Sequence, residues 1–287
     1  MTARADVVKG SALVSRTLHS RGLLHGLTSG VVRKVAGKLA NDGRYVYVNA
    51  CGHQVEADLS DYMERIGFFG AHSSKLVRFI TEHLSPGDWA IDAGANVGLI
   101  SSPMAAAVGS LGCVWAIEPL PRNVERLQSL RKDNQLTQLE IFPVALSSEA
   151  STARLRLSSL PGGSGSASLV APWAEPEYVE VRTCTLDELV TASDPRRPLR
   201  LLKIDVEGFE LELLAGARET LATQRPLVVC EFHDALLKSA GTSADGLVDA
   251  FAKHGYVPTA PLGRPPGSID GRVVDMLLAP RAAANSM

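Results

Sequence analysis

The chain has 287 residues, of which 45% are hydrophobic, and its formal net charge at pH 7 is −2. This size allows one large α/β domain with an appendage or two modest domains, and the near-neutral charge gives no indication of nucleic-acid binding. No apolar stretch approaches the roughly 18 residues of a membrane span, and the first residues lack the apolar core of a secretion signal, so we expect a soluble, cytoplasmic protein.

The first 40 residues differ in charge from the rest of the chain. They carry a net charge of +6, which leaves −8 for the remainder. Apolar residues recur among them at helical spacing, which favours a packed helical face with a solvated basic side. The alternative is peripheral contact between residues 1–40 and an anionic membrane or partner. The apolar positions are Leu24, Leu27, Val31, Val35 and Leu39.

The residues that follow, up to Leu84, are predicted to belong to a cap and not to the cofactor-binding fold. The stretch "GRYVYVNACGHQVEADL" predicts two short strands around a turn at Asn49 to Gly52. Helical patterning resumes from about Ser73 to Leu84, and Pro86 with Gly87 then interrupts the chain. We therefore predict a cap of helices and a hairpin over residues 1–84, followed by a second unit over residues 85–287.

The second unit opens with "DWAIDAGANVG". Its apolar start does not alternate, which is typical of a parallel strand covered on both faces. Asp92 stands at the end of this strand, and Gly94 and Gly98 allow the positive φ angles of a tight turn close to a ligand. Asn96 is the next most tolerant residue for such angles. The pattern indicates a turn that holds a nucleotide-like cofactor.

From this turn onward strands and helices alternate, which predicts a mostly parallel sheet with helices on both faces. The predicted strands are Trp89–Asp92, Cys113–Glu118, Leu139–Val144, Leu201–Asp205 and Leu227–Glu231, and "RVVDMLLA" is the last strand. The predicted helices are Leu99–Val108, Pro121–Asn134, Glu210–Leu221 and Ser243–His254.

An insertion at about residues 152–186 interrupts this alternation of strands and helices. Its two halves alternate like antiparallel strands, and a Gly/Ser-rich loop at Pro161 to Ser168 joins them. The loop is either a mobile flap over a site or a long surface hairpin.

An acid on the second strand supports a nucleoside-type cofactor. Glu118 lies 20 residues beyond Gly98, where doubly wound folds place a carboxylate for ribose hydroxyls. Asp92 at the head of the turn would repel a pyrophosphate but suits a cationic ligand such as S-adenosylmethionine. Methyl transfer is therefore favoured over the alternative, an NAD-dependent oxidoreductase, whose Gly-x-Gly-x-x-Gly motif is missing.

Polar residues also gather at the end of later strands. Lys203, Asp205 and Glu207 stand at every second position, as side chains on one face of a strand do, and the next strand ends with Glu231 and His233. Ligands of open α/β sheets bind outside such carboxyl ends, so these residues are candidates for a crevice facing the glycine turn. In the alternative interpretation Lys203 only neutralises Asp205, and Glu207 only caps the following helix.

Five motifs in order resemble the FkbM family of S-adenosylmethionine-dependent methyltransferases: "AIDAGANVG", "AIEPLPRN", "TLDEL", "LLKIDVEGFELELLAGA" and "PLVVCEFH". The resemblance covers about Pro86 to Glu231. It implies a class I methyltransferase, Rossmann-like fold with a mostly parallel seven-stranded sheet, and methylation of a hydroxyl on a sugar or secondary metabolite. It also assigns cofactor contacts to Asp92, Gly94, Ala95, Asn96, Gly98, Glu118, Pro119 and Asp205, with Asp205 to Gly208 at the reacting end.

An alcohol nucleophile must lose a proton, and two hypotheses provide for this. In the first, His233 is the general base, with Asp205 and Glu207 beside it, because an imidazole titrates near neutral pH. In the second, Asp205, Glu207 and Glu231 bind Mg²⁺, which acidifies the bound hydroxyl. A non-catalytic binding protein that keeps the fold is the remaining alternative.

The acceptor is expected to be a small molecule or a glycan. Its identity depends on the cap, on His72 and on the Pro161 to Ser168 loop, and the sequence does not define it. Four cysteines, Cys51, Cys113, Cys184 and Cys230, lie far apart without a Cys-x-x-Cys pair. We expect free thiols, buried at Cys113 and Cys230, instead of disulfides or zinc ligands.

Overall fold

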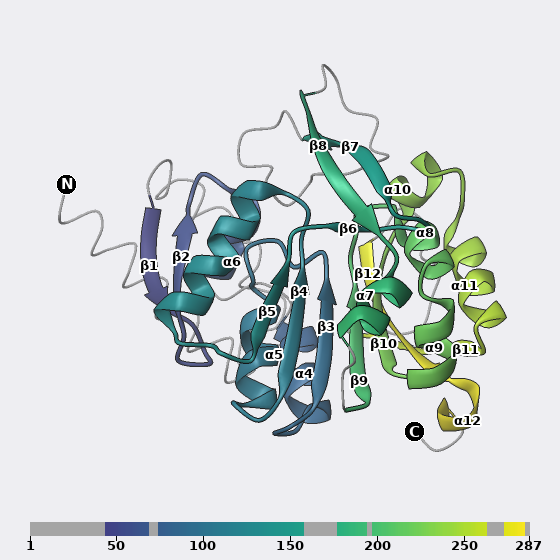
Figure 1. The fold of residues 1–287 in the computed structure, drawn as a ribbon, viewed down its shortest axis with the longest axis horizontal. Helices are drawn as coiled ribbons and strands as arrows, with labels where there is room; N and C mark the ends of the chain where they lie inside the picture. The colour runs from purple at the N-terminus through teal and green to yellow at the C-terminus, as the bar shows by residue number, and fades with distance from the viewer. Residues whose placement is uncertain (1–43, 69–73, 158–176, 194–196, 263–272, 285–287) are drawn as a thin grey trace.

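The computed structural model describes residues 44–68, 74–157, 177–193, 197–262 and 273–284, which are drawn as ribbon in Figure 1. The predictions for residues 1–40, for His72 and for the Pro161 to Ser168 loop lie outside the described residues. In the described part, no helix is both long and apolar enough to cross a membrane.

A seven-stranded sheet forms the centre of the fold, in the order β11-β12-β10-β9-β3-β4-β5. Strands β5, β4, β3, β9 and β10 are parallel, whereas β12 and β11 are antiparallel to their neighbours. The predicted mostly parallel α/β architecture is therefore confirmed. The strands are β3 (Trp89–Ala93), β4 (Cys113–Ile117), β5 (Leu139–Phe142), β9 (Leu199–Ile204), β10 (Leu227–His233), β11 (Tyr256–Pro261) and β12 (Val273–Pro280).

The direction in which strands are added reverses between β3 and β9. The chain builds β3, β4 and β5 outward to one side and then returns to place β9 and β10 on the other side of β3. Open α/β sheets bind ligands at such a reversal, outside the carboxyl ends of the two central strands, and we call this edge of the sheet the crevice. This position holds both the end of β3 at Ala93 and the end of β9 at Ile204.

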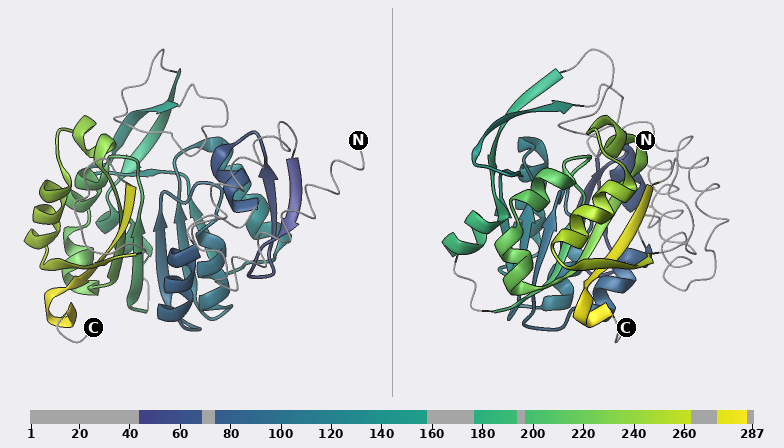
Figure 2. Two further views of the ribbon diagram at one scale, coloured as in Figure 1. Left: turned by 180° about the vertical axis from the view of Figure 1, so that it is seen from behind. Right: turned by 90° about the vertical axis from the view of Figure 1, so that its right-hand side faces the viewer.

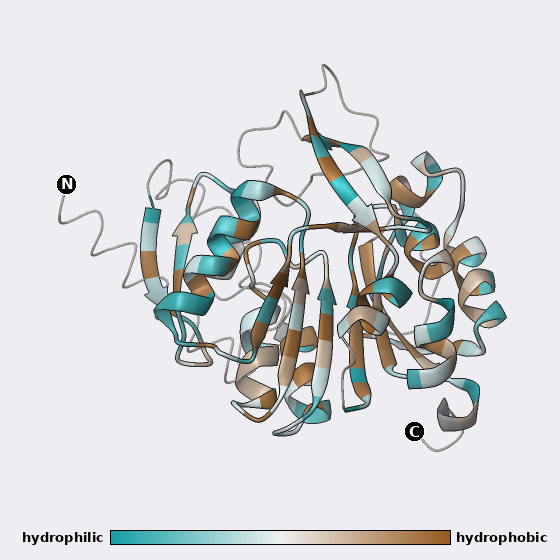
Figure 3. Cartoon of the chain, viewed as in Figure 1, coloured by the Kyte–Doolittle hydropathy of each residue, from teal (hydrophilic) through white to brown (hydrophobic). Residues whose placement is uncertain are grey.

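Helices cover both faces of the sheet because successive side chains of each strand point to opposite faces. Ala90 belongs to the hydrophobic cluster under α4, α5 and α6, whereas its neighbours Trp89 and Ile91 belong to the cluster under α7 to α11. Figure 2 shows the two layers from behind and from the side, and Figure 3 shows the apolar strands between them. The helices are α4 (Ser74–His83), α5 (Ser101–Val108), α6 (Pro121–Asp133), α7 (Leu186–Ser193), α8 (Glu210–Ala215), α9 (Arg218–Gln224), α10 (Asp234–Ser239), α11 (Ala244–Lys253) and α12 (Arg281–Ala284).

The predicted N-terminal hairpin is present as β1 (Arg44–Val48) and β2 (Gln54–Asp58), followed by α3 (Tyr62–Phe68). The hairpin lies beside α6 in Figure 1. Tyr47, Val55 and Phe68 are buried in the same cluster as the helices on that face of the sheet. The hairpin therefore shares a hydrophobic core with the sheet unit.

The predicted antiparallel insertion is also present. β7 (Ser151–Leu157) pairs with β8 (Glu177–Cys184), and β8 pairs with the short β6 (Ala145–Leu146). In Figure 1 this ribbon stands beyond the carboxyl ends of β3, β4 and β5. At its base, a Cβ on Gly216 would lie 2.0 Å from the carbonyl oxygen of Ser147, so only glycine permits this contact.

The boundaries of one predicted helix were wrong, and one strand was not predicted. The single helix predicted at Glu210–Leu221 is divided into α8 and α9 at Gly216, which packs against Ser147. Strand β11 was not predicted because Pro258 and Pro261 interrupt its pattern. Prolines are tolerated there since β11 is an edge strand.

Candidate functional site

One buried ammonium group joins the two central strands at the crevice. Lys203 Nζ lies 3.1 Å from Asp92 Oδ1 and 3.2 Å from Asp205 Oδ2, and it donates a 3.0 Å hydrogen bond to the carbonyl oxygen of Gly94. Burial alone would lower the pKa of Lys203, but the carboxylates of Asp205 and Asp92 raise it above its ordinary value. Lys203 therefore stays charged and holds β3 and β9 in register.

Asp92 is completely buried. Its second oxygen accepts a 2.6 Å hydrogen bond from Ser101 Oγ at the start of α5. Both oxygens of the carboxylate thus have protein partners, and Lys203 compensates its charge. Asp92 therefore links the glycine turn's strand to α5 through Ser101 and to β9 through Lys203.

The glycine turn has the backbone geometry that the sequence predicts. Gly94, Asn96 and Gly98 have φ angles of 77°, 50° and 87°. A Cβ on Gly94 would lie 1.8 Å from the carbonyl oxygen of Asp205, so glycine is required for the two loops to meet. Asn96 Oδ1 is buried and has no hydrogen-bond partner among the described residues, which leaves it available to a ligand donor. Ala95 is buried in the turn beside it.

Glu118 organises the turn from the neighbouring strand. Its Oε2 accepts from the backbone N–H of Asn96 at 2.9 Å, and its Oε1 accepts from the N–H of Leu120 at 2.9 Å and from Asn123 Nδ2 at 3.3 Å. Burial raises the pKa of Glu118, although these hydrogen bonds oppose the shift. A carboxylate offers about four lone-pair positions, so one acceptor position remains. Pro119, between these elements, is half-buried.

The other side of the crevice carries carboxyl groups in a row. Ile204 of β9 pairs with Cys230 of β10, so the next residues, Asp205 and Glu231, are neighbours across the sheet. Glu231 in turn pairs directly with Asp275 of β12. Sequence reasoning missed Asp275, although an acid inside the apolar run "RVVDMLLA" was a signal that could have found it.

Four carboxyl groups around Asp205 have raised pKa values: Glu207, Glu210, Glu231 and Asp275. Burial, with the charges of Asp205 and Glu210 nearby, raises the pKa of Glu207 to about 9. Burial and the same Asp205 raise the pKa of Asp275 to about 6, and the pKa of Glu231 lies well above its ordinary value. Glu207 also has a positive φ of 55°, which turns the loop sharply before Gly208. Glu210, at the start of α8, has a pKa raised to about 7 by burial.

His233 ends β10 and caps α10. Its Nδ1 accepts a long hydrogen bond of 3.4 Å from the backbone N–H of Leu236. A neutral imidazole whose Nδ1 accepts carries its proton on Nε2. For His233 to take a proton from a substrate, this weak cap must open or the tautomer must change.

The predicted metal set is not supported. In the described part of the chain, no three His, Cys, Asp or Glu side chains form a group that could hold a metal ion. A physical reason is that Lys203 already lies against Asp205 and supplies the positive charge there. The predicted trio of Asp205, Glu207 and Glu231 therefore does not form an Mg²⁺ site in this structure.

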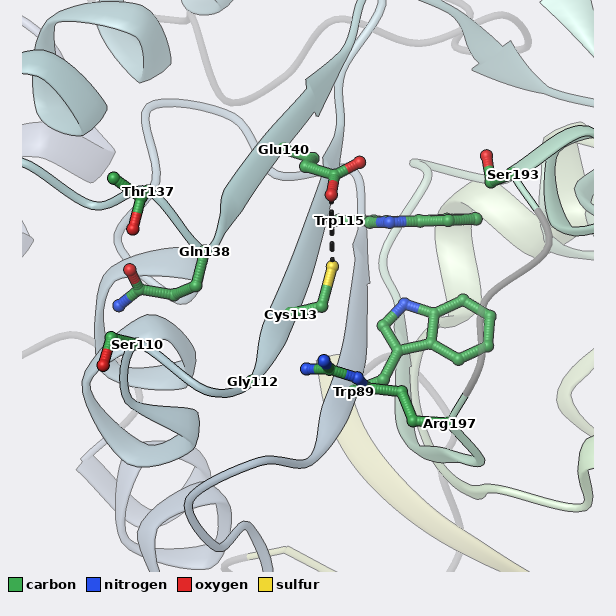
Figure 4. A pocket seen from close by; sticks show the side chains of 10 residues that line it. All are labelled: Trp89, Ser110, Gly112, Cys113, Trp115, Thr137, Gln138, Glu140, Ser193 and Arg197. Atoms are coloured by element: carbon green, nitrogen blue, oxygen red, sulfur yellow. Dashed lines mark hydrogen bonds between the residues drawn. The ribbon is translucent and has the colours of Figure 1, made fainter.

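A cavity of about 330 Å³ lies elsewhere, at the amino ends of β3 and β4. Figure 4 shows Cys113 Sγ pointing toward Glu140, with the indoles of Trp89 and Trp115 beside it. Burial and Glu140 raise the pKa of the Cys113 thiol to about 12, so it is not a reactive thiolate. All four cysteines are free, as predicted, but Cys230 is fully buried whereas Cys113 is only half-buried. This cavity is separate from the crevice at the carboxyl ends.

Comparisons with known proteins agree with the motifs. The methyltransferase FkbM domain model matches residues 92–258. The hexuronic acid methyltransferase AglP of Haloferax volcanii is 25% identical over 158 residues, which are 55% of this chain and 61% of that protein. This chain therefore spans less than two thirds of the length of that relative.

Two solved structures are similar at lower levels. The methyltransferase FkbM of Methylobacillus flagellatus KT has a TM-score of 0.45 and 14% identity, covering 88% of this chain and 58% of that chain. Fibrillarin of Aeropyrum pernix, solved with bound S-adenosyl-L-methionine, has a TM-score of 0.44 and 12% identity, covering 83% of each chain. The family match itself extends from Asp92 at the glycine turn to Pro258 in β11, more than half of the sequence. The chain therefore belongs to the methyltransferase FkbM family.

Proposed function

We propose that this protein transfers a methyl group from S-adenosylmethionine to a hydroxyl of a small molecule or glycan. The observation that carries the proposal is the meeting of two family segments at one edge of the sheet. Gly94 of the glycine turn touches the backbone of Asp205, and Lys203 binds both segments. The name of the relative AglP, a hexuronic acid methyltransferase, supports a sugar acceptor.

The residues on the β3 and β4 side fit the cofactor. Gly94, Ala95, Asn96 and Gly98 would surround its methionine part, with the free Asn96 Oδ1 as an acceptor for the ammonium group. Glu118, beside Pro119, keeps one acceptor position for a ribose hydroxyl. When bound, S-adenosylmethionine supplies an electrophilic methyl group on a sulfonium. The protein contributes alignment and the exclusion of water.

The row of carboxyl groups would bind the acceptor. Asp205 lies between the two halves of the crevice. Glu207 would orient the attacking hydroxyl, and His233, one strand away, would receive its proton. We propose His233 as the base because opening a 3.4 Å capping bond is inexpensive. The Asp205 side chain, 3.2 Å from Lys203 Nζ, would lie on the same edge of the sheet as the imidazolium that forms.

Isothermal titration calorimetry with S-adenosylhomocysteine tests the donor side. We expect micromolar binding by the full chain and no competition from NAD. Tighter binding of NAD would favour the oxidoreductase instead, and binding without turnover of any tested acceptor would favour a non-catalytic protein.

Two substitutions at one position test the base. Asn is a good capping residue, so His233→Asn keeps the start of α10 while removing the imidazole, whereas His233→Ala removes both. We expect both variants to bind S-adenosylhomocysteine normally and to lose about 100-fold or more in kcat. An unchanged kcat in His233→Asn would exclude His233 as the base and leave Glu207 as the candidate.

A further inference from the structure

The loop of the N-terminal hairpin reaches the helix that follows the cofactor turn. Asn49 Nδ2 donates a 2.7 Å hydrogen bond to Ser102 Oγ on α5, and His53 Nδ1 lies 2.8 Å from the same oxygen. Ser102 is completely buried. These are side-chain contacts between elements about 50 residues apart in the sequence.

The loop is shaped to present these two side chains together. Asn49 Oδ1 accepts from the backbone N–H groups of Cys51 at 2.9 Å and His53 at 3.1 Å, which closes the turn. Because the amide of Asn49 donates to Ser102 Oγ, the Ser102 hydroxyl is free to donate to His53 Nδ1. Burial lowers the pKa of His53, which favours the neutral imidazole that this arrangement needs.

The contact lies one residue from the buried carboxylate of the crevice. Ser102 and Ser101 are consecutive in the first turn of α5, and Ser101 Oγ donates the 2.6 Å hydrogen bond to Asp92 Oδ2. The backbone N–H of Ser102 donates a 2.9 Å hydrogen bond to the carbonyl oxygen of Gly98, which joins the first turn of α5 directly to the glycine turn. Helix α3 also packs closely here: a Cβ on Gly67 would lie only 2.7 Å from Cδ2 of Leu99, the residue after the glycine turn.

We propose that Asn49 and His53 are positioning residues for the cofactor site. They fix Ser102, and through the first turn of α5 they fix Ser101, Asp92 and the glycine turn. Both residues lie outside the family-matched segment, which begins at Asp92. The hairpin thus completes a donor site that the matched segment does not complete alone. This inference rests on the proposed function, because the site that it completes is the one for S-adenosylmethionine.

The test compares three variants and one control variant of the full chain by calorimetry with S-adenosylhomocysteine and by steady-state kinetics. Asn49→Asp keeps the acceptor that closes the loop but removes the donor to Ser102. His53→Ala removes the acceptor, and His53→Asn restores a polar atom at the position of Nδ1. We expect about tenfold weaker S-adenosylhomocysteine binding in the first two variants and recovery to within about threefold of wild type in His53→Asn. A rise in KM for S-adenosylmethionine with an unchanged kcat at saturation separates positioning from chemistry.

Asn134→Ala is the matched control. Asn134 fastens the same hairpin to α6 through hydrogen bonds with the backbone of Gln54 at 2.6 and 2.8 Å, and it does not touch Ser102. If Asn134→Ala weakens S-adenosylhomocysteine binding as much as Asn49→Asp does, general docking of the hairpin explains the effect and the specific role of Ser102 is wrong. Unchanged affinity in Asn49→Asp and His53→Ala, with thermal stability like wild type, would also overturn the inference. Failure of the wild-type chain to bind S-adenosylhomocysteine would instead reject the proposed function.

Discussion

The two sides of the crevice solve the problem of buried carboxylates in opposite ways. On the β3 and β4 side, Asp92 and Glu118 are bonded on both oxygens by a lysine, a serine and backbone N–H groups. On the β10 and β12 side, Glu231 and Asp275 face each other and Asp205, and their pKa values rise. The first arrangement is preorganised and keeps free acceptor positions on Asn96 and Glu118, whereas the second is costly until something binds. Under the proposed function, this difference corresponds to a fixed donor half and an adaptable acceptor half.

The largest expected effect comes from removing the close contact in the donor half. In Gly94→Ala the new Cβ would lie 1.8 Å from the carbonyl oxygen of Asp205, so we expect S-adenosylhomocysteine affinity to fall more than 100-fold. Gly241→Ala is the control, because Gly241 has the same φ of 77° and nothing within 4 Å of its Cβ position. The control should cost about 1–2 kcal/mol of stability without changing affinity. Equal behaviour of the two variants, by calorimetry and denaturation, would contradict the close-contact argument.

The next effect separates a buried ion pair from an exposed one. We expect Lys203→Met to lower the free energy of unfolding by about 3–5 kcal/mol at pH 7.5, because Asp92 and Asp205 lose their shared cation. Lys238→Met removes an exposed cation that lies 2.8 Å from Asp234 and should cost less than about 1 kcal/mol. Urea denaturation of the two variants and the wild type measures this difference. Equal losses in the two variants would contradict the role of burial.

A gradual effect, spread over several pH units, belongs to the proposed acceptor half. The pKa of Glu207 is about 9 in the folded chain against an ordinary value of 4.5, so between these pH values the folded state holds a proton that the unfolded state has released. Stability should therefore fall as pH rises from about 5 to 9, by at most about 1.4 kcal/mol per pH unit for this group. In Glu207→Gln the free energy of unfolding should fall less steeply with pH. Denaturation at several pH values measures this dependence, and an identical dependence in the variant would show that Glu207 does not cause it.

The smallest effect concerns the charge of the acceptor. Near pH 7 Asp275 is mostly ionised, since its pKa is about 6, and it would repel a carboxylate on a bound sugar. We expect kcat/KM for a neutral glycoside to exceed that for the matching uronide by about tenfold. In Asp275→Asn this ratio of the two kcat/KM values should be smaller. A preference for the uronide in the wild type would mean that the acceptor lies away from β12.

The donor half was largely predictable from the sequence because its signals are local. Positive φ at Gly94 and Gly98 and an acid at the end of the next strand are read from spacing within one βαβ unit. What could not be predicted is how completely these acids are bonded. The sequence contains no sign that Glu118 binds two backbone N–H groups or that Lys203 reaches the carbonyl of Gly94.

The acceptor half was less predictable because it depends on strand register. Asp275 reaches Glu231 only through an antiparallel pairing with β12, whose register cannot be read from one sequence. The contact between His53 and Ser102 has the same origin, since it joins a hairpin loop to a distant helix. Periodicity reports which face of an element is buried, and it does not report which distant side chain will meet it.

The contact of Gly216 with Ser147 has a consequence for how this enzyme family can diversify. Beside it, the backbone N–H of Asp187 donates to the carbonyl of Gly216, and the Asp187 carboxylate accepts from the N–H groups of Glu219 and Thr220 at the start of α9. The β7–β8 ribbon is thus joined to the sheet by backbone contacts at its base, and its own Leu155 and Val181 pack against Leu120. We expect an exchange of this ribbon between family members to leave the central sheet folded, provided that these contacts are kept.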